Sequence, residues 1–203
     1  MLETILEVLL IVTILMTGFR RIKLFIYAFA VQSLCIALIC FYLAYTTGEN
    51  SLYSVGVMTI FMKVILTSGL IKRVSKSLKE NREKEFIIGG LLSYVLCIAG
   101  IIITYGLLAD FGPPFLKVGV VLMIVGSILL VGRKEAITQM IGFLTIENGI
   151  VLLEIYMVKM SLIIEAGLML EVVILAIIMG TMIFNINREF DTINTDTFSN
   201  TKR

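Results

Sequence analysis

Residues 141–154 read IGFLTIENGIVLLE, an apolar run that is interrupted by Glu147 and Asn148. The run lies inside a longer apolar stretch, at about residues 136–158, that is long enough to cross a bilayer as one helix. Similar stretches recur along the chain, and their apolar residues do not alternate as they do in the strands of a membrane barrel. The sequence therefore predicts an all-α integral membrane protein.

The composition supports this prediction. The 203 residues are 59% hydrophobic and only 16% charged, and their mean hydropathy is +1.02, far above the values of water-soluble domains. The start of the chain carries Glu3 and Glu7 and no basic segment, so the first apolar stretch is expected to be a retained helix and not a cleaved signal peptide.

The set of possible metal ligands is small. The chain has no histidine, and its cysteines, Cys35, Cys40 and Cys97, stand apart inside apolar stretches. Haem and iron–sulfur centres need axial histidines or clustered thiolates. The sequence therefore predicts a chain without a redox cofactor or a metal site of its own.

Charged and turn-forming residues divide the chain into seven expected transmembrane helices joined by short connections, which favours antiparallel neighbours. The expected helices lie at about residues 2–19, 24–46, 53–71, 86–108, 115–132, 136–158 and 161–185. All but three of the 17 basic residues fall on one side of this arrangement; the exceptions are Lys63, Lys117 and Lys159. Basic residues concentrate in cytoplasmic loops, so the N-terminus is expected outside the cytoplasmic membrane and the C-terminus inside.

Two acidic residues are expected near the middle of the membrane. Glu147 lies in the sixth expected helix, beside Thr145 and Asn148, and Glu171 lies at similar depth in the seventh. A carboxylic acid in hydrocarbon is costly and often functional. Two neighbouring acids that influence each other's protonation can pass a proton, although a neutral acid that only joins helices by hydrogen bonds is an alternative.

Other charged residues are candidates for the same site. Lys63 lies in the middle of the third expected helix, where a buried carboxylate partner is expected, in a structural ion pair or in proton transfer. Glu165 and Glu154 lie nearer the outer surface, as auxiliary acids of a proton path or as ordinary interfacial residues; for Glu154 the interfacial interpretation is preferred. Polar and small residues in these helices are expected to join helices closely: Gln32, Ser33, Gly119, Gly126, Gly142 and Gly149.

Several stretches together resemble the hydrogenase-4 component E family, a NuoK-like membrane subunit of complex I-related hydrogenases and formate hydrogenlyases. These stretches are YAFAVQSL (27–34), Lys63-Val64, RKEAITQMIGFLTIENG (133–149), IIEAGLMLEVVILAIIMG (163–180) and FDTINTD (190–196). The resemblance divides the chain into a four-helix membrane segment (1–112), a NuoK-like three-helix segment (113–187) and a polar cytoplasmic tail (188–203). Glu171 matches the second membrane carboxylate of NuoK, where the family more often has Asp. Glu147 matches the first with a displacement of about one helical turn.

The resemblance implies a non-redox subunit that contributes buried carboxylates to proton or ion translocation coupled to hydrogen production. Proton-exchanging roles are then expected for Glu147 and Glu171, a counter-charge at Lys63, hydrogen bonding at Asn148 and an auxiliary acid at Glu165. The implied partners are soluble subunits with a nickel–iron centre and iron–sulfur clusters, antiporter-like membrane subunits and the bilayer; no nucleic acid is expected. Two alternatives remain, a subunit of a multisubunit cation/proton antiporter and a structural membrane spacer.

Overall fold

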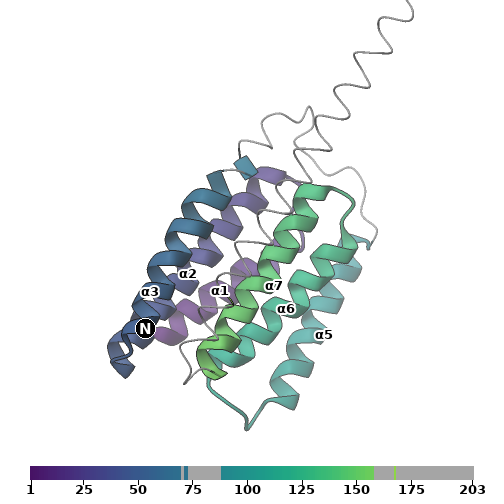
Figure 1. Ribbon diagram of the computed structural model, residues 1–203. Helices are drawn as coiled ribbons and strands as arrows, with labels where there is room; N and C mark the ends of the chain where they lie inside the picture. The colour runs from purple at the N-terminus through teal and green to yellow at the C-terminus, as the bar shows by residue number, and fades with distance from the viewer. Residues whose placement is uncertain (70, 73–87, 158–166, 168–203) are drawn as a thin grey trace, which may run out of the picture. The chain divides into compact units, whose positions relative to one another are not determined.

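The structure is a computed structural model that describes residues 1–69, 71–72, 88–157 and 167. All elements in these residues are helices (Figure 1), and the contacts discussed below belong to one compact unit, Met1–Ser161. The elements are α1 (Leu2–Met16), α2 (Ile22–Thr47), α3 (Asn50–Thr59), η1 (Ile60–Thr67), α5 (Gly90–Leu107), α6 (Pro114–Gly132) and α7 (Ala136–Met157). The element η1 is a π-helix that continues directly from α3.

Five of these helices are long and apolar enough to cross a membrane: α2, α3 with η1, α5, α6 and α7. The prediction of an all-helical membrane protein is therefore supported within the described residues. The helix α1 has 15 residues and ends at Met16, three residues before the predicted end of the first span. The predicted seventh span, 161–185, and the tail, 188–203, lie outside the described residues.

The helix ends follow from local chemistry. The backbone of α1 tightens at its end, where the amides of Thr17 and Gly18 bond to carbonyls three residues earlier, which is a common way to end a helix. The helix α2 ends at Gly48, whose φ of 74° lies in the left-handed region that glycine adopts without steric cost. The helix α6 begins with Pro114, whose fixed φ suits the first helical turn.

The helix α2 lies at the centre of the packing, because it contacts α1, α3, η1 and α7, whereas α5 packs mainly against α6. The most extensive contact joins α6 and α7. Two glycine pairs form this contact, Gly126 with Gly142 and Gly119 with Gly149, and a Cβ added at any of the four would meet the backbone of the facing helix at 2.5–3.0 Å. The prediction that these glycines allow close helix approach is confirmed.

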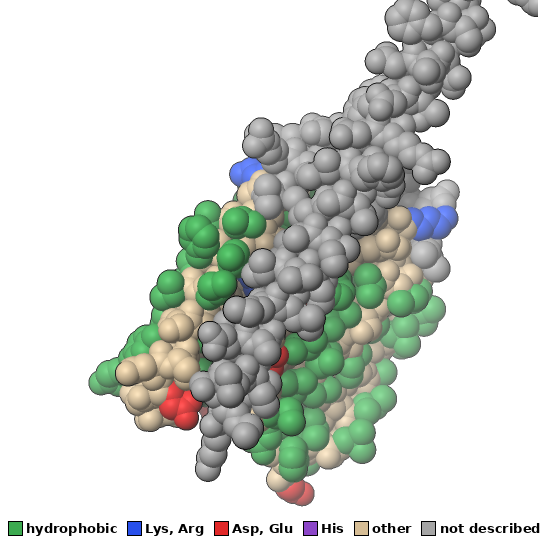
Figure 2. Space-filling view, in the orientation of Figure 1, with side chains coloured by type: hydrophobic (Ala, Val, Ile, Leu, Met, Phe, Trp, Pro, Cys, Tyr) green, Lys and Arg blue, Asp and Glu red, His purple; other side chains and the backbone are tan. Residues whose placement is uncertain are grey.

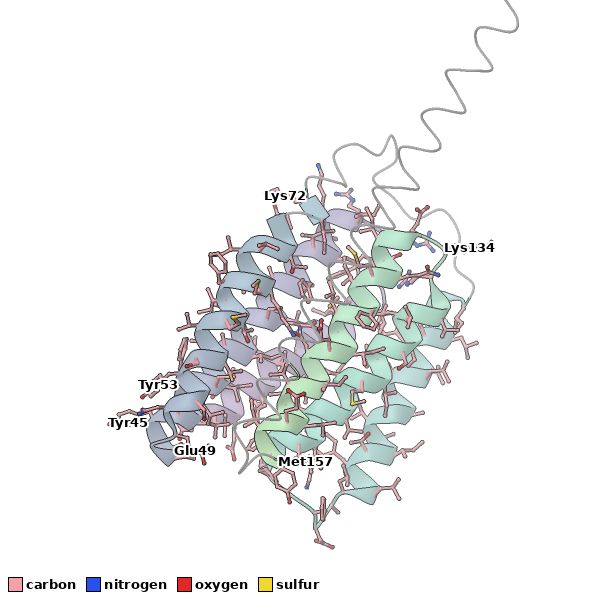
Figure 3. All side chains as sticks on the ribbon, in the orientation of Figure 1. Tyr45, Glu49, Tyr53, Lys72, Lys134 and Met157 are labelled. Atoms are coloured by element: carbon pink, nitrogen blue, oxygen red, sulfur yellow. The ribbon has the colours of Figure 1, made fainter. Side chains whose placement is uncertain are left out.

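The two ends of the bundle differ in charge. One end, which we call the basic end, carries Lys72 and Lys134, and the opposite end carries Glu49 and Met157 (Figure 3). Between the two ends, apolar side chains cover the sides of the described helices (Figure 2). This distribution suits a protein whose helices cross a membrane.

Candidate buried polar site

Polar side chains from four elements meet inside this apolar bundle. They come from α1, α2, η1 and α7, and every member is at most 1% exposed. We call this set the polar cluster; it consists of Thr13, Gln32, Ser33, Lys63, Thr145 and Asn148. Buried polar groups are stable when their hydrogen bonds are made within the protein, so the bonds of this cluster decide what it can do.

The polar cluster has two layers along the bundle. The first layer consists of Lys63, Asn148 and Ser33 and contains the formal charge of the cluster. The Lys63 ammonium donates a hydrogen bond of 3.0 Å to the amide oxygen of Asn148. The amide nitrogen of Asn148 donates in turn to the hydroxyl of Ser33, at 3.4 Å. This chain fixes the orientation of the amide, because its oxygen faces the cation and its nitrogen faces a hydroxyl acceptor. Three elements, η1, α7 and α2, are joined in this way at one level.

The second layer consists of Thr13, Gln32 and Thr145 and lies nearer the basic end than the first. The amide nitrogen of Gln32 donates to the hydroxyl of Thr13, at 2.7 Å, and that hydroxyl donates to the carbonyl of Leu9, also at 2.7 Å. The hydroxyl of Thr145 donates to the carbonyl of Ile141 at 2.8 Å and lies 3.4 Å from the amide oxygen of Gln32. Gln32 therefore joins α1 to α7 through both ends of its amide.

The lysine of the first layer lies in the π-helical element. In η1, the hydroxyl of Thr67 donates to the carbonyl of Met62 at 2.7 Å. The hydroxyl of Ser68, directly after η1, donates to the carbonyl of Lys63 at 3.0 Å. Both bonds span five residues, the spacing of a π-helix. Short π-helical segments are frequent at functional sites, and this one determines how the Lys63 backbone is held.

Glu147 lies beside the polar cluster on α7, directly before Asn148, and is 8% exposed. It therefore occupies the buried position that the sequence predicted, next to the residue that binds Lys63. Glu154 lies one heptad further along α7 and is half-buried. Glu165 and Glu171 lie outside the described residues, so the expected pairing of Glu147 with Glu171 remains a prediction.

The prediction that Gln32 and Ser33 join helices is confirmed. Thr145 and Asn148 also make buried hydrogen bonds. Sequence reasoning missed Thr13, which shares the buried side of α1 with Leu6, Leu9 and Met16. The spacing of these residues at three and four positions was a signal that could have identified it.

Sequence reasoning counted Arg133 among the basic residues of the cytoplasmic side and did not predict its burial. The side chain is 2% exposed. Its guanidinium donates to the carbonyl of Thr17 and lies 5.3 Å from the centre of the Phe25 ring. Arg133 thus binds the carbonyl end of α1, where a cation is favoured by the helix dipole, and holds α1, α2 and α6 together at the basic end.

The remaining candidate metal ligands of the described residues do not form a cluster. Cys35, Cys40 and Cys97 are free and buried, and within residues 1–69, 71–72, 88–157 and 167 no three His, Cys, Asp or Glu side chains are grouped as metal ligands would be. The chemistry available in the described residues is that of a buried ammonium, a buried guanidinium, a nearly buried carboxyl group, amides, hydroxyls and thiols.

Comparisons with protein-family models, with curated proteins and with solved structures gave no match to this chain. The resemblance to the hydrogenase-4 component E family is therefore carried by the sequence stretches quoted above and remains a prediction.

Proposed function

We propose that the chain is a non-redox membrane subunit of a complex I-like nickel–iron hydrogenase, in which its buried charged residues take part in proton or ion translocation. The observation that carries this proposal is the hydrogen bond between Lys63 and Asn148 in the interior of the bundle, beside Glu147. A chain that served only as a spacer could fill these positions with apolar residues, because buried charge rarely adds net stability.

The chemistry of these groups suits reversible proton exchange. A carboxyl group and an amine can each bind and release one proton, and the protonation of each responds to neighbouring charge. Asn148 accepts a hydrogen bond from the Lys63 ammonium without carrying charge itself. Asn148 thereby helps to hold Lys63 in place, and the charge of Lys63 can act on the carboxyl group of Glu147 beside the polar cluster.

The finer architecture belongs to the same proposal. We propose seven transmembrane helices, with the N-terminus outside the cytoplasmic membrane and the basic end in the cytoplasm, following the distribution of basic residues. Glu171 is proposed as the proton-exchanging partner of Glu147, with Glu165 as an auxiliary acid. The nickel–iron centre and the iron–sulfur clusters are proposed to reside in partner subunits, and antiporter-like subunits are proposed as membrane neighbours.

Two measurements on the native complex test the proposal. The tagged full-length chain is purified from its own membranes under mild conditions, and co-purifying subunits and bound nickel and iron are identified. Inverted membrane vesicles are then assayed for hydrogen production and for the accompanying proton gradient. We expect Glu147→Gln to leave assembly and hydrogen production in place and to abolish the gradient. The matched control is Glu49→Gln, because Glu49 is an exposed acid at the opposite end of the bundle.

The outcomes separate the alternatives. A purified complex without nickel and iron that exchanges cations for protons would replace the hydrogenase with a cation/proton antiporter. A nickel-containing complex in which both Glu147→Gln and Glu171→Gln leave the gradient unchanged would identify a structural spacer.

A further inference from the structure

One buried hydroxyl in the bundle differs from the others. Thr59 is 2% exposed, and its Oγ1 atom has no hydrogen-bond partner among the residues that the structure describes. A helical threonine can bond to the carbonyl four residues before it, and Thr59 does not make this bond. The other threonine hydroxyls buried in the bundle donate to a backbone carbonyl, as seen for Thr13, Thr17, Thr67, Thr104, Thr138 and Thr145.

Thr59 is close to the charged layer of the polar cluster. It is the last residue of α3, four positions before Lys63, and both residues belong to the buried side of this span. The span runs from Asn50 at the opposite end toward Lys72 at the basic end. Thr59 therefore lies about one helical turn from Lys63, on the side of the opposite end.

A second polar atom flanks Lys63 on that side. Cys40 is fully buried in α2, the helix that packs against α3 and η1. It follows Ser33 by seven residues and is therefore displaced toward the opposite end. The Cys40 thiol, a weak donor and acceptor, and the unbonded hydroxyl of Thr59 thus both lie nearer the opposite end than Lys63.

The other side of Lys63 is different. There, the second layer of the polar cluster uses its donors internally: the hydroxyl of Thr13, the amide nitrogen of Gln32 and the hydroxyl of Thr145 all donate to protein atoms. None of these groups titrates near neutral pH. These three donors are used within the protein, whereas the Thr59 hydroxyl, toward the opposite end, has no partner among the described residues.

We propose that Thr59 binds a water molecule between Lys63 and the opposite end of the bundle, and that Lys63 exchanges protons through this water. A buried hydroxyl is expected to have a partner, and ordered water is the usual one where protein atoms supply none. A hydronium ion that reaches this position gives one proton to the neutral amine of Lys63 and remains as water; the reverse step releases the proton. The water site stands on the geometry, and the exchange step rests on the proposed function.

The water site is tested on the full chain in lipid nanodiscs by radiolytic labelling in ¹⁸O water, which oxidises reactive side chains next to bound water. Cys40 is the reporter and Cys97, buried in α5, is the internal reference. Thr59→Val removes the hydroxyl and keeps the shape, and Thr59→Ser keeps the hydroxyl. Thr104→Val is the matched control, because the Thr104 hydroxyl is equally buried and is bonded to the carbonyl of Gly100.

We expect Cys40 to be labelled faster than Cys97, and this excess to be lost in Thr59→Val and kept in Thr59→Ser and Thr104→Val. The melting temperature of Thr59→Val is expected to fall, because the variant removes a partner of the water. Equal labelling of both cysteines in the unmodified chain, unchanged labelling in Thr59→Val, or a higher melting temperature for Thr59→Val would overturn the water site.

The exchange step is tested in the vesicles used for the proposed function. If Thr59→Val loses the Cys40 labelling and slows formation of the gradient, with hydrogen production retained, proton exchange through this water is supported. If labelling is lost and the gradient is unaffected, Lys63 does not exchange protons through this site. A complex without hydrogenase would refute the proposed function and leave the water site, measured by labelling, intact.

Discussion

Lys63 of η1 and Asn148 of α7 are 85 positions apart in the sequence and are joined by a buried hydrogen bond of 3.0 Å. Each partner alone is a poor residue for the interior of a bundle: one carries a charge, and the other has an amide with both a donor and an acceptor to satisfy. Together with Ser33 they satisfy the amide of Asn148 at both ends. The bond therefore ties the third span to α7 and orients the lysine.

Removing the amide from this pair is expected to destabilise the protein. Asn148→Leu leaves Lys63 without this acceptor and Ser33 without this donor, and hydrogen bonds to charged groups contribute about 1.5–3 kcal/mol. We expect the free energy of unfolding to fall by about this amount, and by about 1 kcal/mol in Ser33→Ala. Reversible denaturant titration in detergent measures both changes.

The control for these variants is Ser127→Ala, because the Ser127 hydroxyl is exposed and bonds only to the carbonyl of Met123 in its own helix. Its effect is expected to be within about 0.5 kcal/mol. A double-mutant cycle of Lys63→Met with Asn148→Leu should give a coupling energy above about 0.5 kcal/mol. Additive effects of the two substitutions would show that the bond does not form in the protein.

The extents of the described helices could be predicted closely from the sequence, because long apolar runs and the residues that end them act locally. The breaks at Gly48 and at Pro113-Pro114 are two such signals. The close contact of α6 and α7 was also predictable, because glycines seven residues apart recur on one helix face. These features need no knowledge of the neighbouring helices.

The features that depend on neighbours were not predictable. The π-helical bonds around Lys63 change the backbone register by one residue, and no composition signal marks that change. The burial of Arg133 depends on where α1 ends, because its acceptor is the Thr17 carbonyl. The bond from Lys63 to the amide of Asn148 also comes from tertiary packing, and the carboxylate partner that the sequence suggested stays a prediction.

The glycine contact between α6 and α7 predicts a steric effect. A Cβ at Gly126 would lie 2.7 Å from the carbonyl oxygen of Gly142 and from the amide of Ile146. These are backbone atoms, so relief requires the helices to separate. We expect Gly126→Ala to lower the free energy of unfolding by about 1–3 kcal/mol, measured by denaturant titration in detergent.

Gly106 provides the matched control for this substitution. It lies inside α5, and a Cβ there meets nothing within 4 Å. Gly106→Ala should therefore be neutral or stabilising by up to about 1 kcal/mol, because alanine is the better helix former. Equal effects at Gly126 and Gly106 would contradict a close helix contact.

The side-chain bonds of the π-helical element predict a local effect. Thr67→Ala and Ser68→Ala each remove one hydroxyl that bonds to a carbonyl five residues earlier. We expect each variant to lower the free energy of unfolding by about 0.5–1.5 kcal/mol and to speed amide hydrogen exchange between Met62 and Ser68. The comparison variant is Thr46→Ala, whose exposed hydroxyl bonds to carbonyls three and four residues earlier. Unchanged exchange in both variants would show that these hydroxyls do not support the π-helical register.

The contacts of Arg133 predict that a substitution that keeps its charge and one that removes it will lower the free energy of unfolding by different amounts. Its planar guanidinium both donates to the Thr17 carbonyl and stacks near the Phe25 ring, and lysine reproduces neither the planar stacking nor the donor geometry. We expect Arg133→Met to lower the free energy of unfolding by about 1–3 kcal/mol, because the carbonyl at the end of α1 loses a buried donor. The free energy of unfolding of Arg133→Lys should lie between that of Arg133→Met and that of the unmodified chain.

The exposed base Lys23 is the control, and Lys23→Met should change the free energy of unfolding by no more than about 0.5 kcal/mol. If Arg133→Met were as stable as Lys23→Met, the arginine would not hold the basic end of the bundle together.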